Sequence, residues 1–319
     1  MSEIDAQARE RRRDIYTFDQ FAEARARFEA IGASAAPDPL TALARPNAAT
    51  AAMDRVQAAF EARDWTAMRA VYATDAKIED RRHLALASGD VDWWIADKQQ
   101  VARVRPGARY ERQLVGTYGD RLALERVLWT GEPEAGRFEV EYLWLTGVDE
   151  RGRITGAISF DPDDWGAASR EACDRWLASD AAAAPVVRPV SEFFLAFSEH
   201  DRVRVRAVLA DDLVVDDRRR AGLGRVDGAD AYVESIAVLW NLAPDIQVDG
   251  RVGLALERHG LVSAGRDFGT LAEGGAFERL RVAVLIVAGG RITRFEMFDV
   301  EDVDAALARF AELRPKTSP

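Results

Sequence analysis

A ten-residue segment occurs twice in this chain in closely similar form, and this repetition constrains the fold more than any other feature. The first copy, residues 73–82, reads ATDAKIEDRR, and the second copy, residues 210–219, reads ADDLVVDDRR. The aspartates that precede the two arginines are 137 positions apart. Later in the chain, residues 152–155 and 290–293 both read GRIT, at a spacing of 138. A nearly constant offset over this span indicates an internal duplication.

The two copies share one predicted order of secondary structure. Two helices precede the strand that carries the aspartate, a third helix begins near Gly89 and near Gly228, and three longer strand-like runs follow. Turn residues then lead into a last strand and a closing helix. The predicted helices and long strands are residues 47–63, 65–72, 108–117, 121–129 and 136–147 in the first copy, and residues 190–199, 202–209, 246–256, 261–267 and 276–287 in the second. Because helices come first and strands after them, we expect the α+β class, with two tandem cone-shaped barrels in which a curved, mostly antiparallel sheet wraps around helices.

Two segments have the composition of linkers. Residues 33–46 contain three prolines, and residues 181–189 are rich in alanine and end in proline. Residues 14–32 resemble the last strand and helix of a copy, so we expect the end of a truncated repeat there, or a helix packed on the first domain. The predicted divisions of the chain are residues 1–45, a partial repeat with a linker; residues 46–180, the first domain; and residues 186–314, the second domain.

Composition restricts the classes of partner and cofactor. The 319 residues include 54 acidic and 43 basic side chains, and this formal charge of −11 disfavours a nucleic-acid partner. The single cysteine, Cys173, excludes an intrachain disulfide and suits a reducing cytoplasm. No apolar run is long enough to span a membrane, and the first residues do not read as a signal peptide. Histidines and glycines lack the spacing of zinc, phosphate-loop or dinucleotide sites, so we expect no metal and no cofactor.

The segment from Tyr72 to Asp80, which ends in a Glu-Asp pair, resembles the strand that carries the general base of ketosteroid isomerase. Gly89 matches the glycine that starts a helix in that family, and residues 149–154 resemble its late hairpin. The chain is therefore similar to the SnoaL-like, or nuclear transport factor 2-like, superfamily, which also includes polyketide cyclases. The resemblance implies a cone-shaped pocket in each domain, and it implies that Asp80 and Asp217 stand at the position of the isomerase's base.

Strand alternation indicates separately that both aspartates face inward. The residues that share this face are Ala76, Ile78, Asp80 and Arg82 in the first copy, and Leu213, Val215, Asp217 and Arg219 in the second. Partial desolvation would raise the pKa of an aspartate toward that of a useful base, whereas a neighbouring arginine would lower it. A general base and an Asp–Arg ion pair at the mouth of the pocket therefore both remain open.

Other parts of the isomerase site are missing by the same resemblance. Its first-helix tyrosine matches Val56 and Phe193, and its late-strand acid matches Trp144 and Val282. Without these hydrogen-bond donors, isomerisation of the steroid type is not expected. SnoaL-like cyclases use an aspartate and a histidine, so His83 is either a group that reaches the first pocket's mouth or a solvated loop residue.

The two copies also differ in their aromatic content. Side chains that could line an apolar cavity in the first copy, or simply fill its core, are Trp93, Trp94, Trp129, Tyr142 and Trp144. The second copy is more aliphatic, and Val282, Val284 and Ile286 alternate along its late strand. Glu278 is in line with Val282, so it is expected to supply a second inward carboxylate.

Two functions follow from these residues. The first is a cofactor-independent isomerase, cyclase or lyase acting on a small apolar carbonyl or polyketide-like substrate. Asp80 and Asp217 would be its bases, Tyr142 and His83 its partner donors, and Arg82 would position a substrate oxygen. The alternative is a non-catalytic ligand-binding or assembly module derived from a larger bacterial regulatory protein. In either case we expect the two domains to pair with each other, with a homodimer as a further possibility.

Overall fold

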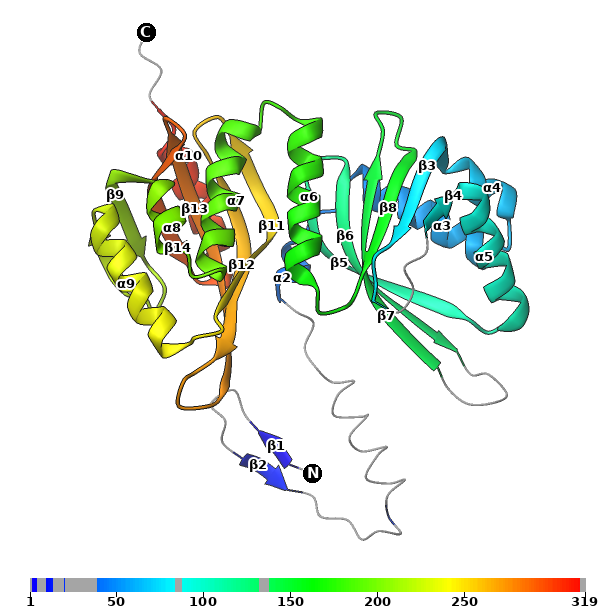
Figure 1. Cartoon of the computed structure of the whole chain (residues 1–319), viewed down its shortest axis with the longest axis horizontal. Coiled ribbons are helices and arrows are strands. Elements are labelled where there is room, and N and C mark those ends of the chain that lie inside the picture. The colour runs from blue at the N-terminus through cyan, green and yellow to red at the C-terminus, as the bar shows by residue number, and fades with distance from the viewer. Residues whose placement is uncertain are drawn as a thin grey trace. The chain divides into compact units, whose positions relative to one another are not determined.

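The computed structural model describes residues 2–4, 10–13, 20, 39–83, 88–131 and 138–315 (Figure 1). Near the beginning of the chain, β1 (Ser2–Ile4) pairs antiparallel with β2 (Glu10–Arg13). The partial repeat expected at residues 14–32 lies, apart from Gln20, outside the described residues. No described helix is long and apolar enough to cross a membrane.

The first repeat consists of a helical half followed by strands and a closing helix. Its elements are α3 (Ala48–Glu61), α4 (Trp65–Ala70), β3 (Tyr72–Asp80), β4 (Ser88–Asp90), α5 (Val91–Val104), β5 (Arg109–Tyr118), β6 (Leu122–Gly131), β7 (Phe138–Val148), β8 (Ile154–Phe160) and α6 (Trp165–Ser179). The strands form a six-stranded sheet in the order β4-β3-β8-β7-β6-β5. The β3–β8 pair is parallel and the other pairs are antiparallel.

The second repeat has the same order of elements and the same sheet connectivity. Its elements are α7 (Ala184–Ser198), α8 (Arg202–Ala207), β9 (Leu209–Asp217), β10 (Gly224–Asp227), α9 (Ala229–Leu242), β11 (Gln247–Glu257), β12 (Gly260–Thr270), β13 (Ala276–Ala288), β14 (Arg291–Phe298), the short 3-10 helix η2 (Val300–Asp302) and α10 (Val303–Glu312). The sheet order is β10-β9-β14-β13-β12-β11, and β9 and β14 are parallel. The expected α+β class with two tandem units is confirmed.

Both segments that we expected to be linkers contain helix. Helix α2 (Pro39–Leu43) lies in the first of them, and α7 begins at Ala184, inside the second. Alanine favours helix, and Pro185 stands in the first turn of α7, where a missing N–H is tolerated. The buried side chains of Val186 and Val190 then hold this turn against the core of the second repeat. The connection between α6 and α7 is therefore shorter than residues 181–189, because helix begins at Ala184.

Helices cover both faces of each sheet. In the first repeat, α3, α4 and α5 pack on one face, which we call the inner face, and α6 packs on the opposite, outer face (Figure 1). In the second repeat, α7, α8 and α9 cover the inner face, whereas α10 and α2 cover the outer face. A pocket of the expected kind would lie in the core between the inner face and its helices.

The late strand of the second repeat turns its side chains opposite to our expectation. Ala283 packs in the inner-face core, whereas Val282, Val284 and Ile286 pack on the outer face with α10. Glu278 shares the parity of Val282, and the register of β13 against β12 is continuous between them. The prediction that Glu278 gives the second pocket an inward carboxylate is therefore wrong.

The length of one hairpin turn explains this error. Five residues, 149–153, separate the paired residues Val148 and Ile154, whereas only four, 288–291, separate the equivalent pair Val287 and Ile292 at the turn between β13 and β14. Our sequence comparison applied the offset of 138 to the residues before this turn without a gap. It therefore placed every residue of β13 one position away from its true counterpart, and so on the opposite face of the sheet. The structural counterpart of Trp144 is therefore Ala283 and not Val282.

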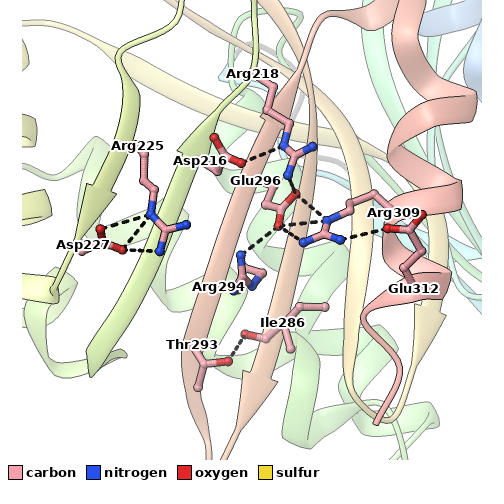
Figure 2. Close-up of polar contacts among 10 residues, drawn as sticks. All are labelled: Asp216, Arg218, Arg225, Asp227, Ile286, Thr293, Arg294, Glu296, Arg309 and Glu312. Atoms are coloured by element: carbon pink, nitrogen blue, oxygen red, sulfur yellow. Dashed lines mark hydrogen bonds and ion pairs between the residues drawn. The ribbon is translucent and has the colours of Figure 1, made fainter. Parts of the chain in front are cut away.

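A cluster of arginines ties the closing helix of the second repeat to its sheet. Glu296 on β14 is fully buried on the outer face, beneath α10. Its carboxylate pairs with Arg218 at 3.1 Å, with Arg294 at 3.0 Å and with Arg309 of α10 at 3.1 Å, as Figure 2 shows. Removing one member of this buried group would leave a charge without its partner. The cluster therefore determines the position in which α10 packs on the sheet.

Candidate functional site

The inward aspartate of the first repeat is held by its neighbouring arginine. Asp80 ends β3 on the inner face, and the Nε and Nη2 atoms of Arg82 donate to its two oxygens at 2.9 and 2.5 Å. Burial raises the pKa of Asp80, but hydrogen bonds from Arg82 and from Ser159 outweigh that effect and leave the pKa below its ordinary value. In this geometry Asp80 is a weak base.

The same pair recurs in the second repeat in a more enclosed form. The side chain of Asp217 is 1% exposed, and Arg219 donates from Nε and Nη2 at 2.8 Å each. The backbone N–H of Leu223 adds a bond of 3.0 Å to the same carboxylate. A Cβ at Gly222 would come within 2.6 Å of Asp217, so glycine allows the loop to close over it. Burial raises the pKa of Asp217, but these donors outweigh it and the pKa lies below the ordinary value.

Further charged residues extend this pair across the inner face of the second repeat. Asp267 on β12 accepts from Arg281 on β13 at 2.5 Å and from Arg279 at 3.3 Å. Arg219 approaches the same carboxylate at 3.7 Å, which connects the two pairs. The guanidinium of Arg281 lies 5.4 Å above the ring of Phe194 on α7. An ion-pair network therefore occupies the place where we expected an aliphatic pocket.

Aromatic residues occupy the equivalent positions in the first repeat. Strand pairing makes Trp129 and Tyr142 the counterparts of Asp267 and Arg281. The indole N–H of Trp129 donates to the hydroxyl of Tyr142 at 2.9 Å. In the same core, Trp94 donates to the hydroxyl of Tyr72 at 3.0 Å.

A small cavity lies among these aromatic side chains. Its volume is about 20 Å³, and Trp129, Tyr142 and Trp144, which we had expected to line a pocket, are in its wall. The indole N–H of Trp144 is buried and has no hydrogen-bond partner among the described residues. The hydroxyls of Tyr72 and Tyr142 already accept a hydrogen bond, so each retains its O–H for donation. Burial raises the pKa of Tyr142 to about 12, so its hydroxyl stays protonated.

Lys98 is a wall residue of this cavity that our sequence reasoning missed. Lys98 is 8% exposed and shares the buried side of α5 with Val91 and Ile95. Its Nζ lies 3.8 Å from the ring centre of Trp94 and 2.8 Å from Oδ2 of Asp97. Burial lowers the pKa of Lys98, and the carboxylate of Asp97 only partly opposes that effect. Val91, Ile95 and Lys98 follow the i, i+4, i+7 spacing of a buried helix face. That spacing was the sequence signal that could have identified Lys98 as a buried residue.

Three of the expected site residues lie at the surface, away from the cavity. Trp93 is 39% exposed. The His83 side chain is 86% exposed, and its ring pairs with Asp161 on the surface. Glu278 pairs with Arg266 at 2.6 Å on the outer face. The structure therefore favours the reading of His83 as a solvated loop residue.

Arg82 connects the ion pair of the first repeat to the cavity. Its guanidinium lies 4.9 Å above the ring of Tyr142, and Tyr142 is a wall residue. Arg219 instead lies within the ion-pair network of the second repeat.

A much larger hollow lies elsewhere. An open groove of about 1700 Å³ is lined by residues of α6, α7, β11 and β12, within the compact unit Pro39–Pro319. None of the residues that we expected to carry chemistry lines it. In the part of the chain that the structure describes, no group of His, Cys, Asp and Glu side chains is arranged to hold a metal ion.

Comparisons with known proteins find likeness in solved structures. No protein-family model matches the sequence, and no curated protein matches it. An LEH-like epoxide hydrolase from Mycobacterium tuberculosis is 22% identical, with a TM-score of 0.33, and the match covers 41% of this chain and 94% of that one. An NTF2-like protein of unknown function from Burkholderia pseudomallei is 22% identical, with a TM-score of 0.31, over 37% of this chain and 94% of that one. A third, from M. tuberculosis in complex with estradiol-17β-hemisuccinate, is 16% identical, with a TM-score of 0.33, over 35% and 92%.

The likeness to these solved structures concerns the fold alone. Each match covers most of the similar protein and less than half of this chain.

Proposed function

We propose that the interior of the first repeat binds a small apolar molecule through an acceptor oxygen, such as that of a carbonyl group. The observation that carries this proposal is the indole N–H of Trp144, which is buried at the cavity without a partner among the described residues. Leaving a buried donor unpaired costs about 1–3 kcal/mol, so a bound acceptor would recover that energy. The other polar groups of the wall, from Tyr72, Tyr142 and Lys98, are donors too.

The size and walls of the cavity restrict the ligand. A volume of about 20 Å³ is close to what one water molecule needs, so the cavity admits the oxygen of a ligand, and the aromatic side chains of its wall must move apart to admit the apolar body. Aromatic walls suit an apolar body, while a few fixed donors determine its orientation. The unpaired donor of Trp144 favours a ligand that presents an acceptor oxygen.

A role for Asp80 as general base receives less support than a role in ordering the cavity. Both of its oxygens accept hydrogen bonds from Arg82, and its pKa lies below the ordinary value. We infer that Asp80 fixes Arg82 against Tyr142, and that Asp217 and Arg219 belong to a structural network. On this account a reaction of the isomerase, cyclase or lyase class would need another group to start it.

A matched pair of probes tests the binding. Cyclopentanone and cyclopentane have similar shapes, but only cyclopentanone carries an acceptor oxygen. Titration monitored by tryptophan fluorescence is expected to show tighter binding of cyclopentanone. Trp144→Phe removes one donor and should weaken that binding roughly fivefold to tenfold, since one hydrogen bond contributes about 1–1.5 kcal/mol.

A control variant lies in the second repeat. Tyr232 is a buried tyrosine of its inner-face core, and Tyr232→Phe should leave the affinity for cyclopentanone unchanged. Equal affinity for the ketone and the hydrocarbon, or loss of binding in Tyr232→Phe alone, would contradict the proposal.

Assembly is a second candidate function, and contacts between the repeats favour it. Strand β5 contacts β11, and the guanidinium of Arg266 lies 5.8 Å from the ring centre of Trp165 on α6. On this account the duplication supplies both members of a dimer-like pair in one chain, and the ion-pair network makes the second repeat a rigid partner. Small-angle scattering should then fit one compact particle for residues 39–319. A profile of two beads on a flexible tether would reject the pairing.

A further inference from the structure

Lysine is rare in this chain, and one lysine lies in the core of the first repeat. The sequence has 43 lysine and arginine residues, of which only Lys77, Lys98 and Lys316 are lysines. Lys77 is exposed on β3, whereas Lys98 is buried at the cavity. The matching position of α9 in the second repeat is Ile236, which is buried in that core.

Packing does not explain an amine at this position. The fold accepts an aliphatic side chain at the equivalent point, as Ile236 shows, and burying an ammonium group costs several kcal/mol before any partner compensates it. The ring of Trp94 and the carboxylate of Asp97 compensate part of that cost. A buried, water-poor amine beside donors for an oxygen is the arrangement that amine chemistry on a carbonyl compound requires.

From this arrangement we infer that Lys98 forms an imine with the carbonyl carbon of an aldehyde or ketone bound in the first repeat. The inference rests on the proposed carbonyl-binding function and adds a covalent step to it. The substrate class is a small apolar aldehyde or ketone whose oxygen lies among the donors of Trp144, Tyr72 and Tyr142.

The groups around Lys98 support this chemistry. Burial lowers the pKa of Lys98, and the positive charge of Arg82 acts in the same direction, while Asp97 and Asp80 oppose it. A larger fraction of neutral amine is therefore present than on an exposed lysine, and the neutral amine is the nucleophile. Donors at the oxygen stabilise the negative charge that develops there during attack.

The reaction balances without any other reactant. The nitrogen lone pair of Lys98 attacks the carbonyl carbon, a C–N bond forms, and the carbonyl π electrons move to the oxygen, which takes up a proton. The resulting carbinolamine loses water as the C–O bond breaks and the nitrogen gives up its protons to the departing oxygen and to solvent. One amine and one carbonyl compound thus give one imine and one water molecule.

An imine would also account for the weak basicity of Asp80. A protonated imine withdraws electrons from the neighbouring carbon, so a proton is lost there more easily than from the parent carbonyl compound. A base of lower strength then suffices.

Reductive trapping tests the inference on the full chain. The protein is incubated with cyclopentanone and sodium cyanoborohydride, which reduces an imine to a stable secondary amine, and modified lysines are identified by peptide mass spectrometry. We expect Lys98 to be modified faster than Lys77 and Lys316, which act as internal references. Lys77→Arg should leave this fast modification unchanged, and Lys98→Met should abolish it.

Two further measurements make the result decisive. Thermal melting of Lys98→Met, with Lys98→Gln as a second variant, establishes that the fold is retained, as Ile236 in the other repeat leads us to expect. If cyclopentanone binds in the fluorescence titration but Lys98 reacts no faster than Lys77, the imine is overturned and the binding function stands. If cyclopentanone does not bind at all, the proposed function itself fails.

Discussion

Trp129 donates a hydrogen bond of 2.9 Å to Tyr142 at the two positions where the second repeat has Asp267 and Arg281. In the second repeat those positions form an ion pair of 2.5 Å. One scaffold therefore holds a neutral aromatic pair in one copy and a charged pair in the other. The neutral pair leaves a small cavity with free donors, whereas the charged pair fills its site with a network, so the duplicated repeats are unequal in what they can bind.

The ion pair of the second repeat should be strongly coupled. Asp267→Leu leaves the buried Arg281 without its partner, which typically costs about 3–5 kcal/mol of unfolding free energy, and Arg281→Met removes the shortest contact of Asp267 but leaves Arg279 beside it. The double variant replaces both charges by apolar groups and should lose much less than the sum of the single losses. Urea denaturation of the four proteins measures this coupling, and strictly additive losses would show that the pair is not coupled.

Asp217 should stabilise the fold in a pH-dependent way. Its folded-state pKa lies below the ordinary value of 3.8, so its contribution is present above that pH and is lost as the pH falls through the lower folded value. Urea midpoints measured from pH 7 down to pH 2 should therefore fall more for the natural protein than for Asp217→Asn. A parallel fall in both proteins would contradict the assignment.

Glu125 should have the opposite dependence. Glu125 is buried beside Arg112, and burial raises its pKa from 4.5 to about 7 even though Arg112 opposes the shift. Because the folded state binds this proton more tightly, the contribution is full below pH 4.5 and is lost as the pH rises through 7. Melting temperatures from pH 4 to pH 8 should fall less for Glu125→Gln than for the natural protein, while the exposed control Glu111→Gln should follow the natural protein.

His83 should titrate above its ordinary pKa without affecting ligand binding. A hydrogen bond from the ring to Asp161 raises the pKa of His83 above 6.5, and the charge of Asp161 acts in the same direction. An NMR titration should give a lower pKa in Asp161→Asn. His83→Ala should bind cyclopentanone as the natural protein does, and a loss of affinity would return His83 to the list of site residues.

The scaffold could be predicted from the sequence because duplication repeats each signal. Asp80 and Asp217 were placed on the inner face by strand alternation, and the cores agree, since Ile78 and Val215 pack toward the inner-face helices. The register of β13 could not be predicted, because a turn shorter by one residue leaves no mark in the apolar pattern on either side.

The side chains and contacts inside the two repeats were harder to predict than the fold that encloses them. The sequence pointed to Asp80 by resemblance, but only coordinates show that Arg82 occupies both of its oxygens. A lysine is expected at the surface from its residue type, and the burial of Lys98 depends on the way α5, which also carries Trp94, packs against Trp129. Asp267 and Arg281 become partners only when β12 and β13 are placed in register.

The indole proton of Trp144 reports most directly on the central claim, that an acceptor oxygen completes the cavity of the first repeat. In an NMR spectrum of the indole N–H groups, cyclopentanone should shift the resonance of Trp144 downfield, because that donor gains a hydrogen bond. The resonances of Trp94 and Trp129, which already donate to tyrosine hydroxyls, should move much less. An unchanged Trp144 resonance at saturating cyclopentanone, or an equal shift with cyclopentane, would contradict the account.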